Sequence, residues 1–157
     1  MCVDPVLADR NPVERSAGSL CSGTLQVGYV KTMAKWELVI HPEVRDWLHK
    51  IRKADRETAA LIGQAIYQVI NGRGPDEGRP LVDRIKGSEL HNLKELRPAS
   101  AGTTEVRILF VFDPVRQMVL LVAGDKSGNW QRWYHKAIPL AEARYTEHLA
   151  ALSGRGE

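Results

Sequence analysis

Side chains that can stabilise negative charge or move protons are concentrated in the second half of the 157-residue sequence. Cationic groups neutralise the charge that develops on a phosphate under attack, while histidine, tyrosine and lysine transfer protons. Together they suit the cleavage of a phosphodiester without a metal ion. The candidates for such chemistry are Lys94, Arg107, Lys126, Tyr134 and His135.

The alternation of side chains along a strand predicts which of these groups share a face. In Leu93–Arg97, Lys94 falls on the face of Asn92 and Leu96, and Arg97 falls on the face of Glu95. The simplest interpretation of Glu95 and Arg97 is a structural ion pair on the sheet.

Arg107 belongs to the strongly β-prone run that follows. Alternation places it on the face away from the apolar side chains expected to pack on helices. Burying its charge alone would be unfavourable by several kcal/mol. We therefore expect Arg107 to be paired, solvated or bound to an anion.

Aromatic and basic residues alternate between Trp130 and Lys136. Aromatic rings can stack on nucleobases while Lys and Arg hold phosphates, which is typical of RNA-binding surfaces. Alternatively, Trp130 and Trp133 anchor the last helix. The residues expected to contact RNA are Arg84, Lys86, Arg97, Trp130, Arg132, Trp133 and Lys136.

The charge distribution supports a polyanionic partner. The net charge is +3, but residues 79–136 carry ten basic and six acidic residues, whereas residues 33–78 carry seven of each. A local basic excess favours nucleic acid as a partner. The alternative is a solvated face of long charged side chains.

Metal and cofactor chemistry are poorly supported by the sequence. The five histidines form no pair at helical spacing, and both cysteines, Cys2 and Cys21, precede Met33. The loop Gly124–Gly128 lacks the spacing of a P-loop, although it could still direct Lys126 at a phosphate. We expect no metal and no cofactor. Sparse cysteines fit a reducing cytoplasm, and no apolar run is long enough to cross a membrane.

Hydrophobic periodicity predicts the elements that position these side chains. A short strand over residues 36–40 is followed by two amphipathic helices, one starting near Pro42 and one capped by Asp55 and ending at Asn71. Strands are expected over residues 81–86, 89–97, 104–112 and 117–123, and a last helix over residues 138–152. The order predicts an α+β fold, a small antiparallel sheet with the helices packed on one face.

The domain is expected to span residues 33–152. Residues 1–32 are rich in Pro, Gly, Ser and Asn and predict a disordered tail, or a mis-assigned start if translation begins at Met33. Residues 153–157 are expected to be a disordered end.

The ordered motifs resemble the RelE superfamily of toxins from bacterial type II toxin–antitoxin systems, in its HigB-like, phage-derived branch. The resemblance covers residues 35–152. It rests on Leu93–Arg97, Glu105–Pro114, Leu120–Trp130, Trp133-Tyr134 and the helix start Ile138-Pro139 with Ala141-Glu142.

The resemblance implies a RelE-like fold and a toxin that cuts mRNA in the ribosomal A site and inhibits translation. It also implies a cognate antitoxin, expected to be a helix-turn-helix DNA-binding protein. By the same resemblance Arg107 contacts the scissile phosphate. Glu95 and Asp125 depart from a purely basic site and are interpreted as structural.

Two other functions remain open on the sequence. A ParE-like toxin shares this fold but binds gyrase without cutting RNA, and an inactive homologue would bind an antitoxin alone. The basic, proton-transferring cluster favours the ribonuclease, because a gyrase poison does not need it.

Overall fold

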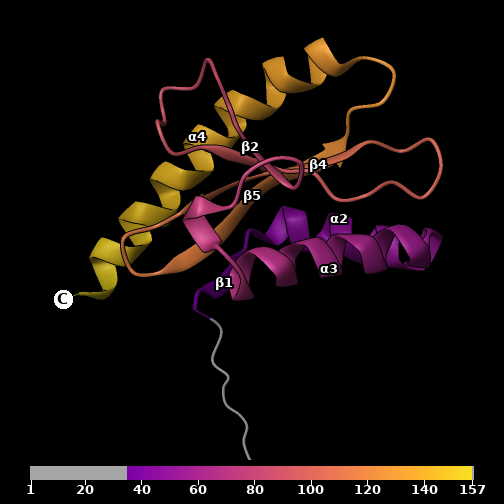
Figure 1. Cartoon of the computed structure of the whole chain (residues 1–157). Helices are drawn as coiled ribbons and strands as arrows, with labels where there is room; N and C mark the ends of the chain where they lie inside the picture. The colour runs from indigo at the N-terminus through magenta and orange to yellow at the C-terminus, as the bar shows by residue number, and fades with distance from the viewer. Residues whose placement is uncertain (1–34, 157) are drawn as a thin grey trace, which may run out of the picture. The chain divides into compact units, whose positions relative to one another are not determined.

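The computed structural model describes residues 35–156, so the expectation for residues 1–32 lies outside the described part of the chain. The class predicted from the sequence, α+β, is confirmed (Figure 1). The elements in chain order are β1 (Glu37–Ile40), α2 (Pro42–Ala54), α3 (Arg56–Asn71), the 3-10 turn η2 (Gly74–Asp76), β2 (Val82–Arg84), β3 (Lys94–Leu96), β4 (Val106–Phe112), β5 (Gln117–Asp125) and α4 (Trp130–Arg155).

The strands form one five-stranded sheet in the order β1-β5-β4-β3-β2. Strands β2 to β5 are antiparallel neighbours, as expected, but β1 pairs with β5 in parallel. The sheet is therefore mixed, which corrects the antiparallel prediction. Strands β1 and β2 form opposite edges of the sheet, so the αα-hairpin that joins them leads the chain from one edge to the other.

The strand predicted over residues 89–97 is shorter than expected. The segment before β3 is a turn held by Glu142 of α4, whose carboxylate accepts hydrogen bonds from Ser88 Oγ at 2.7 Å and from the backbone N–H of Glu89 at 2.8 Å. Strand pairing is thereby limited to Lys94–Leu96.

Helices α2 and α3 cover one face of the sheet, as their apolar stripes predict (Figure 1). Asp55 caps α3 as expected, since its carboxylate accepts a hydrogen bond from the N–H of Thr58 at 3.0 Å. Fully buried side chains from the helices and from alternate strand positions form this core, among them Val44, Ile62, Val69, Leu96, Ile108 and Phe110.

Helix α4 covers the opposite face, which corrects the expectation that all helices share one side. The second core consists of the remaining strand positions and residues of α4, including Leu93, Leu109, Val111, Leu121, Ala141 and Tyr145. Arg144 fastens the helix, donating to the carbonyl of Leu121 at 2.7 Å and pairing with Glu43. Since Arg107 and Glu95 point to this face, both are largely buried beside α4 rather than exposed on an open sheet.

Helix α4 begins eight residues earlier than predicted. Asn129 caps it by accepting a hydrogen bond from the N–H of Arg132 at 3.1 Å, and Pro139 lies inside the helix instead of near its start. The helix continues to Arg155, beyond the boundary expected at residue 152. None of the helices in residues 35–156 is long and apolar enough to span a membrane.

Candidate functional site

Arg107 and Glu95 meet on the α4 face at the end of the sheet where α4 begins. Glu95 lies opposite Leu109 in the β3–β4 register, and Arg107 lies two residues before Leu109 on the same face. The Arg107 Nε atom is 3.7 Å from Glu95 Oε1. Only 8% of Arg107 and 4% of Glu95 is exposed to solvent. Two oppositely charged groups therefore share a mostly buried position.

Tyr134, in the first turns of α4, contacts the pair of Arg107 and Glu95 from the α4 side of the sheet. Its hydroxyl donates a hydrogen bond to Glu95 Oε2. Burial, the hydrogen bond to Glu95 and the Glu95 charge raise the pKa of Tyr134 well above the ordinary tyrosine value. The phenol therefore stays neutral at physiological pH and acts as a hydrogen-bond donor rather than as a base.

One oxygen of Glu95 remains available. Oε1 accepts no hydrogen bond from the residues that the structure describes, although Arg97 Nη1 lies 3.8 Å away and Arg107 Nε 3.7 Å away. The buried Arg107 Nε likewise has no hydrogen-bond partner within residues 35–156. An acceptor and a donor that lack partners thus lie side by side.

A chain of alternating charges extends from this pair along the edge of the sheet. Arg97 Nη1 lies 3.3 Å from Asp83 Oδ2, and Asp83 also pairs with Arg79. The hydrogen bond from Arg79 opposes the effect of burial and lowers the pKa of Asp83, which therefore stays ionised. The expected structural pair of Glu95 and Arg97 is present as a 3.8 Å contact within this larger network.

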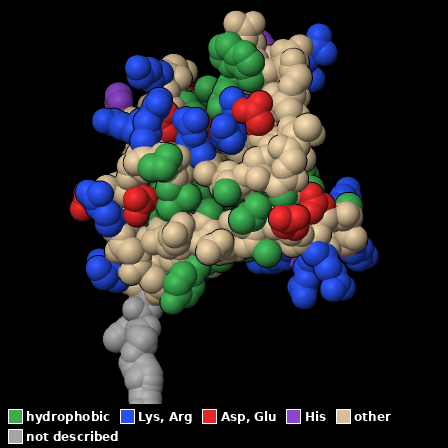
Figure 2. All heavy atoms as spheres, turned by 45° about the vertical axis from the view of Figure 1, so that its right-hand side comes forward, with side chains coloured by type: hydrophobic (Ala, Val, Ile, Leu, Met, Phe, Trp, Pro, Cys, Tyr) green, Lys and Arg blue, Asp and Glu red, His purple; other side chains and the backbone are tan. Residues whose placement is uncertain are grey.

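Arg79, Asp83, Glu95, Arg97 and Tyr134 line an open pocket of about 610 Å³ between β2, β3, the loop after β5 and the start of α4. Arg107, which contacts Glu95, is not itself one of the lining residues. In Figure 2 several Lys and Arg side chains gather in the upper half of the molecule, with acidic side chains among them. The pocket brings together six of the sequence-predicted residues with five that were not predicted. The predicted ones are Arg84, Lys86, Arg97, Lys126, Trp130 and Tyr134; the others are Arg79, Asp83, Ile85, Glu95 and Ile138.

His135 lies in an adjoining hollow of about 540 Å³ along the same side of α4. Lys86, Trp130 and Tyr134 line both hollows, and Trp130 is 55% exposed. An exposed indole beside a cation-lined pocket can stack on a nucleobase.

Lys94 does not join this site. It pairs with Phe110 and therefore faces α2 and α3, on the other side of the sheet from Arg107. Its Nζ donates to the carbonyl of Pro75 at 2.9 Å, which ties β3 to η2. Desolvation, reinforced by the nearby Arg84, lowers the pKa of Lys94. Because the sheet separates it from Arg107, we no longer assign Lys94 a catalytic role.

Arg132, Trp133 and Lys136 lie on the other flank of α4 from Trp130. They line a separate hollow of about 410 Å³ with Val122 and Leu140. Trp133 packs against the α-carbon of Gly124, so its ring anchors the helix, as the alternative interpretation expected. These three residues do not line the 610 Å³ pocket.

The signals for the missed residues differ. Glu95 and Asp83 are acidic, whereas the charge excess points to cations. Alternation places Glu95 on the face of Arg97, but the position of Asp83 beside them depends on the register of β2 with β3. Asp125 has the structural role expected for it: it accepts hydrogen bonds from the N–H groups of Glu105 and Ser127, each at 2.9 Å. These bonds outweigh the effect of burial and lower the pKa of Asp125.

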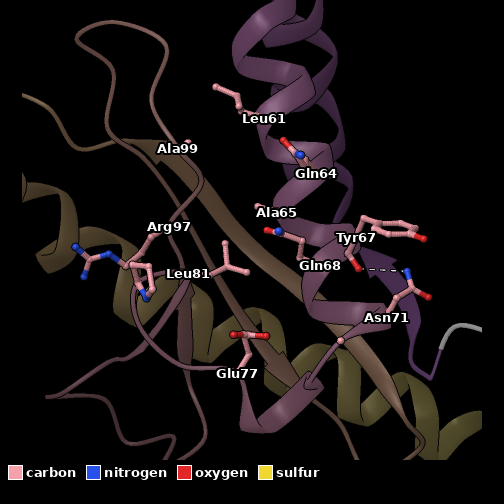
Figure 3. A pocket seen from close by; sticks show the side chains of 12 residues that line it. Leu61, Gln64, Ala65, Tyr67, Gln68, Asn71, Glu77, Leu81, Arg97 and Ala99 are labelled. Carbon is pink, nitrogen blue, oxygen red and sulfur yellow. Dashed lines mark hydrogen bonds between the residues drawn. The ribbon is translucent and has the colours of Figure 1, made fainter.

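A larger hollow of about 840 Å³ lies between α3 and the segments around Leu81 and Ala99 (Figure 3). Amide and apolar side chains of α3 dominate its wall, and its charged lining residues are Glu77 and Arg97. Arg97 also lines the 610 Å³ pocket, and in Figure 3 its guanidinium extends away from α3. Without a buried proton donor and acceptor, this hollow does not resemble a reaction centre.

No group of three or more His, Cys, Asp or Glu side chains in the described part of the chain is arranged to hold a metal ion.

Residues 49–146 match the family model described as phage derived protein Gp49-like. Two similar proteins come from Mycobacterium tuberculosis (strain ATCC 25618 / H37Rv). One, named "Putative toxin HigB2", is 39% identical over 157 residues, which covers 95% of this chain and 76% of the relative. The other, named "Putative toxin HigB3", is 44% identical over 119 residues, covering 76% of this chain and 98% of the relative.

Two solved structures also align with this chain. The YoeB dimer from Staphylococcus aureus matches with a TM-score of 0.45 at 15% identity, over 55% of this chain and 92% of that one. A double mutant of the E. coli toxin RelE in the free state matches with a TM-score of 0.48 at 11% identity, over 68% and 97% respectively.

Proposed function

The chain belongs to the Gp49-like family of phage-derived proteins, and on this basis we propose that it is the toxin of a type II toxin–antitoxin system. In this proposal it is a metal-independent endoribonuclease that cuts mRNA on the ribosome, in the cytoplasm, and so inhibits translation. A cognate antitoxin, expected to be a helix-turn-helix protein, neutralises it. The names of its relatives as toxins support the first part.

The observation that carries the ribonuclease assignment is the contact of the buried Arg107 with Glu95, which lines a pocket with Tyr134 and five cationic side chains. A buried guanidinium is a fixed positive charge, and fixed charges stabilise a developing oxyanion without reorganising. Lys126 adds a second cation at the same place, since its Nζ lies 5.9 Å from the centre of the Tyr134 ring.

The proposed reaction uses the RNA's own nucleophile. The 2′-oxygen attacks the adjacent phosphorus and forms a new P–O bond, while the bond to the 5′-oxygen of the next nucleotide breaks. Glu95 Oε1 accepts the proton of the 2′-hydroxyl, and a proton is delivered to the leaving 5′-oxygen. The products are a 2′,3′-cyclic phosphate and a 5′-hydroxyl end.

The remaining residues position the substrate. Tyr134 holds Glu95 through its hydrogen bond, and Arg107 and Lys126 bind the phosphate that is attacked. We assign proton delivery to His135, whose hollow adjoins the pocket along α4. Trp130 offers a stacking surface, and Arg84 and Lys86 bind neighbouring phosphates.

The test replaces Arg107 by glutamine. In a translating extract the unmodified protein should cut a defined mRNA at ribosome-dependent positions. We expect Arg107→Gln to cut it about 10²- to 10³-fold more slowly, the usual effect of losing one oxyanion-stabilising donor. Primer extension of the mRNA gives the rate, and thermal unfolding monitors the fold.

Arg45→Gln is the matched control, because Arg45 is an exposed arginine on α2 across the sheet. It should cut at the unmodified rate. Intact mRNA together with inhibited gyrase supercoiling would overturn the ribonuclease proposal. Equal cutting by Arg107→Gln would remove Arg107 from the site.

A further inference from the structure

Glu105 places one carboxylate oxygen between the two cations assigned to the scissile phosphate. Its Oε1 lies 3.7 Å from Arg107 Nη2 and 3.6 Å from Lys126 Nζ. Arg107 lies in β4 and Lys126 directly follows β5, and both contact the same oxygen atom of Glu105. A position where two cations converge on one anionic oxygen also suits an oxygen of a phosphate.

The three partners differ in how firmly they are held. The side chains of Arg107 and Lys126 are 10% and 17% exposed, whereas that of Glu105 is 49% exposed. Arg107 is fixed further by a hydrogen bond from Nη1 to the carbonyl of Val106 at 2.8 Å. The two cations are therefore largely preset, and the carboxylate is the partner that can move.

The backbone of Glu105 is anchored independently of its side chain. Its N–H donates to Asp125 Oδ1 at 2.9 Å, and its carbonyl accepts from the N–H of Lys126 at 3.1 Å. The carboxylate can therefore swing into solvent without disturbing the strand or the loop after β5.

We propose that Glu105 is a displaceable internal ligand that occupies the position of a substrate phosphate oxygen between Arg107 and Lys126. This inference rests on the proposed function, because it takes those two cations as the phosphate site. RNA must displace the carboxylate in order to bind. Glu105 thus weakens the affinity of the free protein for RNA and keeps two buried cations paired until a substrate arrives.

The strength of the contact sets the size of the effect. Ion pairs with a solvent-exposed partner contribute little, because water and salt screen them. Displacing Glu105 should therefore require little free energy. We expect Glu105→Gln to tighten binding about three- to fivefold, since Gln keeps the shape and removes the competing charge.

The experiment measures binding without cleavage, using the full 157-residue chain. The first probe is a short fluorescent single-stranded RNA with 2′-O-methyl sugars, which lacks the attacking hydroxyl; anisotropy gives its dissociation constant. The second probe is inorganic sulfate, titrated against chloride at equal ionic strength and followed by the shift in unfolding temperature. Glu105→Gln should bind both probes more tightly than the unmodified protein.

Asp46→Asn is the matched control, because it removes one negative charge from the exposed surface of α2 on the other side of the sheet. It should leave both affinities unchanged. In a Lys126→Met background, Glu105→Gln should have a smaller effect, because only Arg107 remains of the two cations that Glu105 contacts.

Each outcome is decisive. Unchanged or weaker binding of both probes by Glu105→Gln overturns the inference, and so does an equal gain with Asp46→Asn, which would indicate net charge alone. If no variant binds the free RNA, the proposed function is still tested by ribosome-dependent cutting in the translating extract. The sulfate arm then still tests whether Glu105 competes for the anion position.

Discussion

Glu95 is the residue on which the proposed chemistry depends most. A carboxylate that is 4% exposed is unfavourable unless charge or hydrogen bonds compensate for its lost hydration. Here Tyr134 donates to one oxygen, and Arg97 and Arg107 lie within 4 Å of the other. These contacts compensate for the lost hydration of Glu95 in a pocket that is also lined by five cationic side chains.

Tyr134 links the site to stability at alkaline pH. Its pKa in the folded protein is raised, by burial first and by Glu95 second, above its value in the unfolded chain. The stabilisation is therefore complete below the ordinary tyrosine pKa of about 10 and is lost as the pH rises beyond it, since the unfolded chain releases its proton first.

We expect the free energy of unfolding to fall less steeply for Tyr134→Phe than for the unmodified protein between about pH 9.5 and pH 11.5. Urea unfolding followed by tryptophan fluorescence at several pH values measures this. Tyr67→Phe, which alters a tyrosine that is 67% exposed, is the control and should follow the unmodified curve. Parallel curves for Tyr134→Phe would contradict the buried hydrogen bond.

Four of the five cations that line the pocket could be named from the sequence, all but Arg79, because local charge excess and strand alternation are properties of neighbouring residues. Glu95 could be placed on the face of Arg97, but its bond to Tyr134 joins residues 39 positions apart. The separation of Lys94 from Arg107 has a related cause. Alternation assigns each residue a face within its own strand, but only the pairing of β3 with β4 shows that the two side chains lie on opposite faces of the sheet.

Helix α4 contributes Trp130, Tyr134 and Ile138 to the pocket. Its first turn packs against Gly124 of β5. A Cβ atom added to Gly124 would collide with the indole of Trp133. The close approach of β5 and α4 therefore requires glycine at this position. Because Tyr134 is the next residue after Trp133, displacement of the ring would also move the phenol that binds Glu95.

We expect Gly124→Ala to lower the free energy of unfolding by about 1–3 kcal/mol, the usual effect of overpacking, and to slow RNA cleavage. Thermal and urea unfolding measure the first effect, and primer extension measures the second. Gly63→Ala is the control: this position in α3 has nothing within 4 Å of an added Cβ, so alanine should stabilise by about 0.5–1 kcal/mol. Unchanged stability of Gly124→Ala would mean that Trp133 does not hold α4 here.

Most elements could be predicted because their signals are local. Helices α2 and α3 have clear apolar stripes and recognisable ends at Asp55 and Asn71. The start of α4 was missed because Pro139 is normally found in the first turn of a helix, whereas here it lies within one. The parallel pairing of β1, and the placement of α4 on the second face, depend on contacts between distant segments that periodicity does not encode.

For the described part of the molecule, the sheet separates two kinds of surface. Helices α2 and α3 belong to residues 35–78, whose seven basic and seven acidic residues balance. The basic excess of residues 79–136 lies on the strands, their loops and the start of α4. Five cations and two acids line the 610 Å³ pocket, which leaves about three positive charges without an acidic partner there.

This surplus predicts how RNA binding responds to salt. Each phosphate neutralised on a single strand contributes about −0.7 to the slope of log affinity against log salt concentration, so about three unmatched cations give a slope near −2. Anisotropy titrations of the 2′-O-methyl RNA between about 50 and 300 mM KCl measure this slope.

Lys86→Gln, which removes a cation from the pocket lining, should reduce the magnitude of the slope by about 0.7. Lys50→Gln, on the exposed side of α2, should leave it unchanged, because that lysine lies across the sheet from the pocket. A slope near zero, or equal effects of the two substitutions, would mean that RNA is not held by the charges of this pocket.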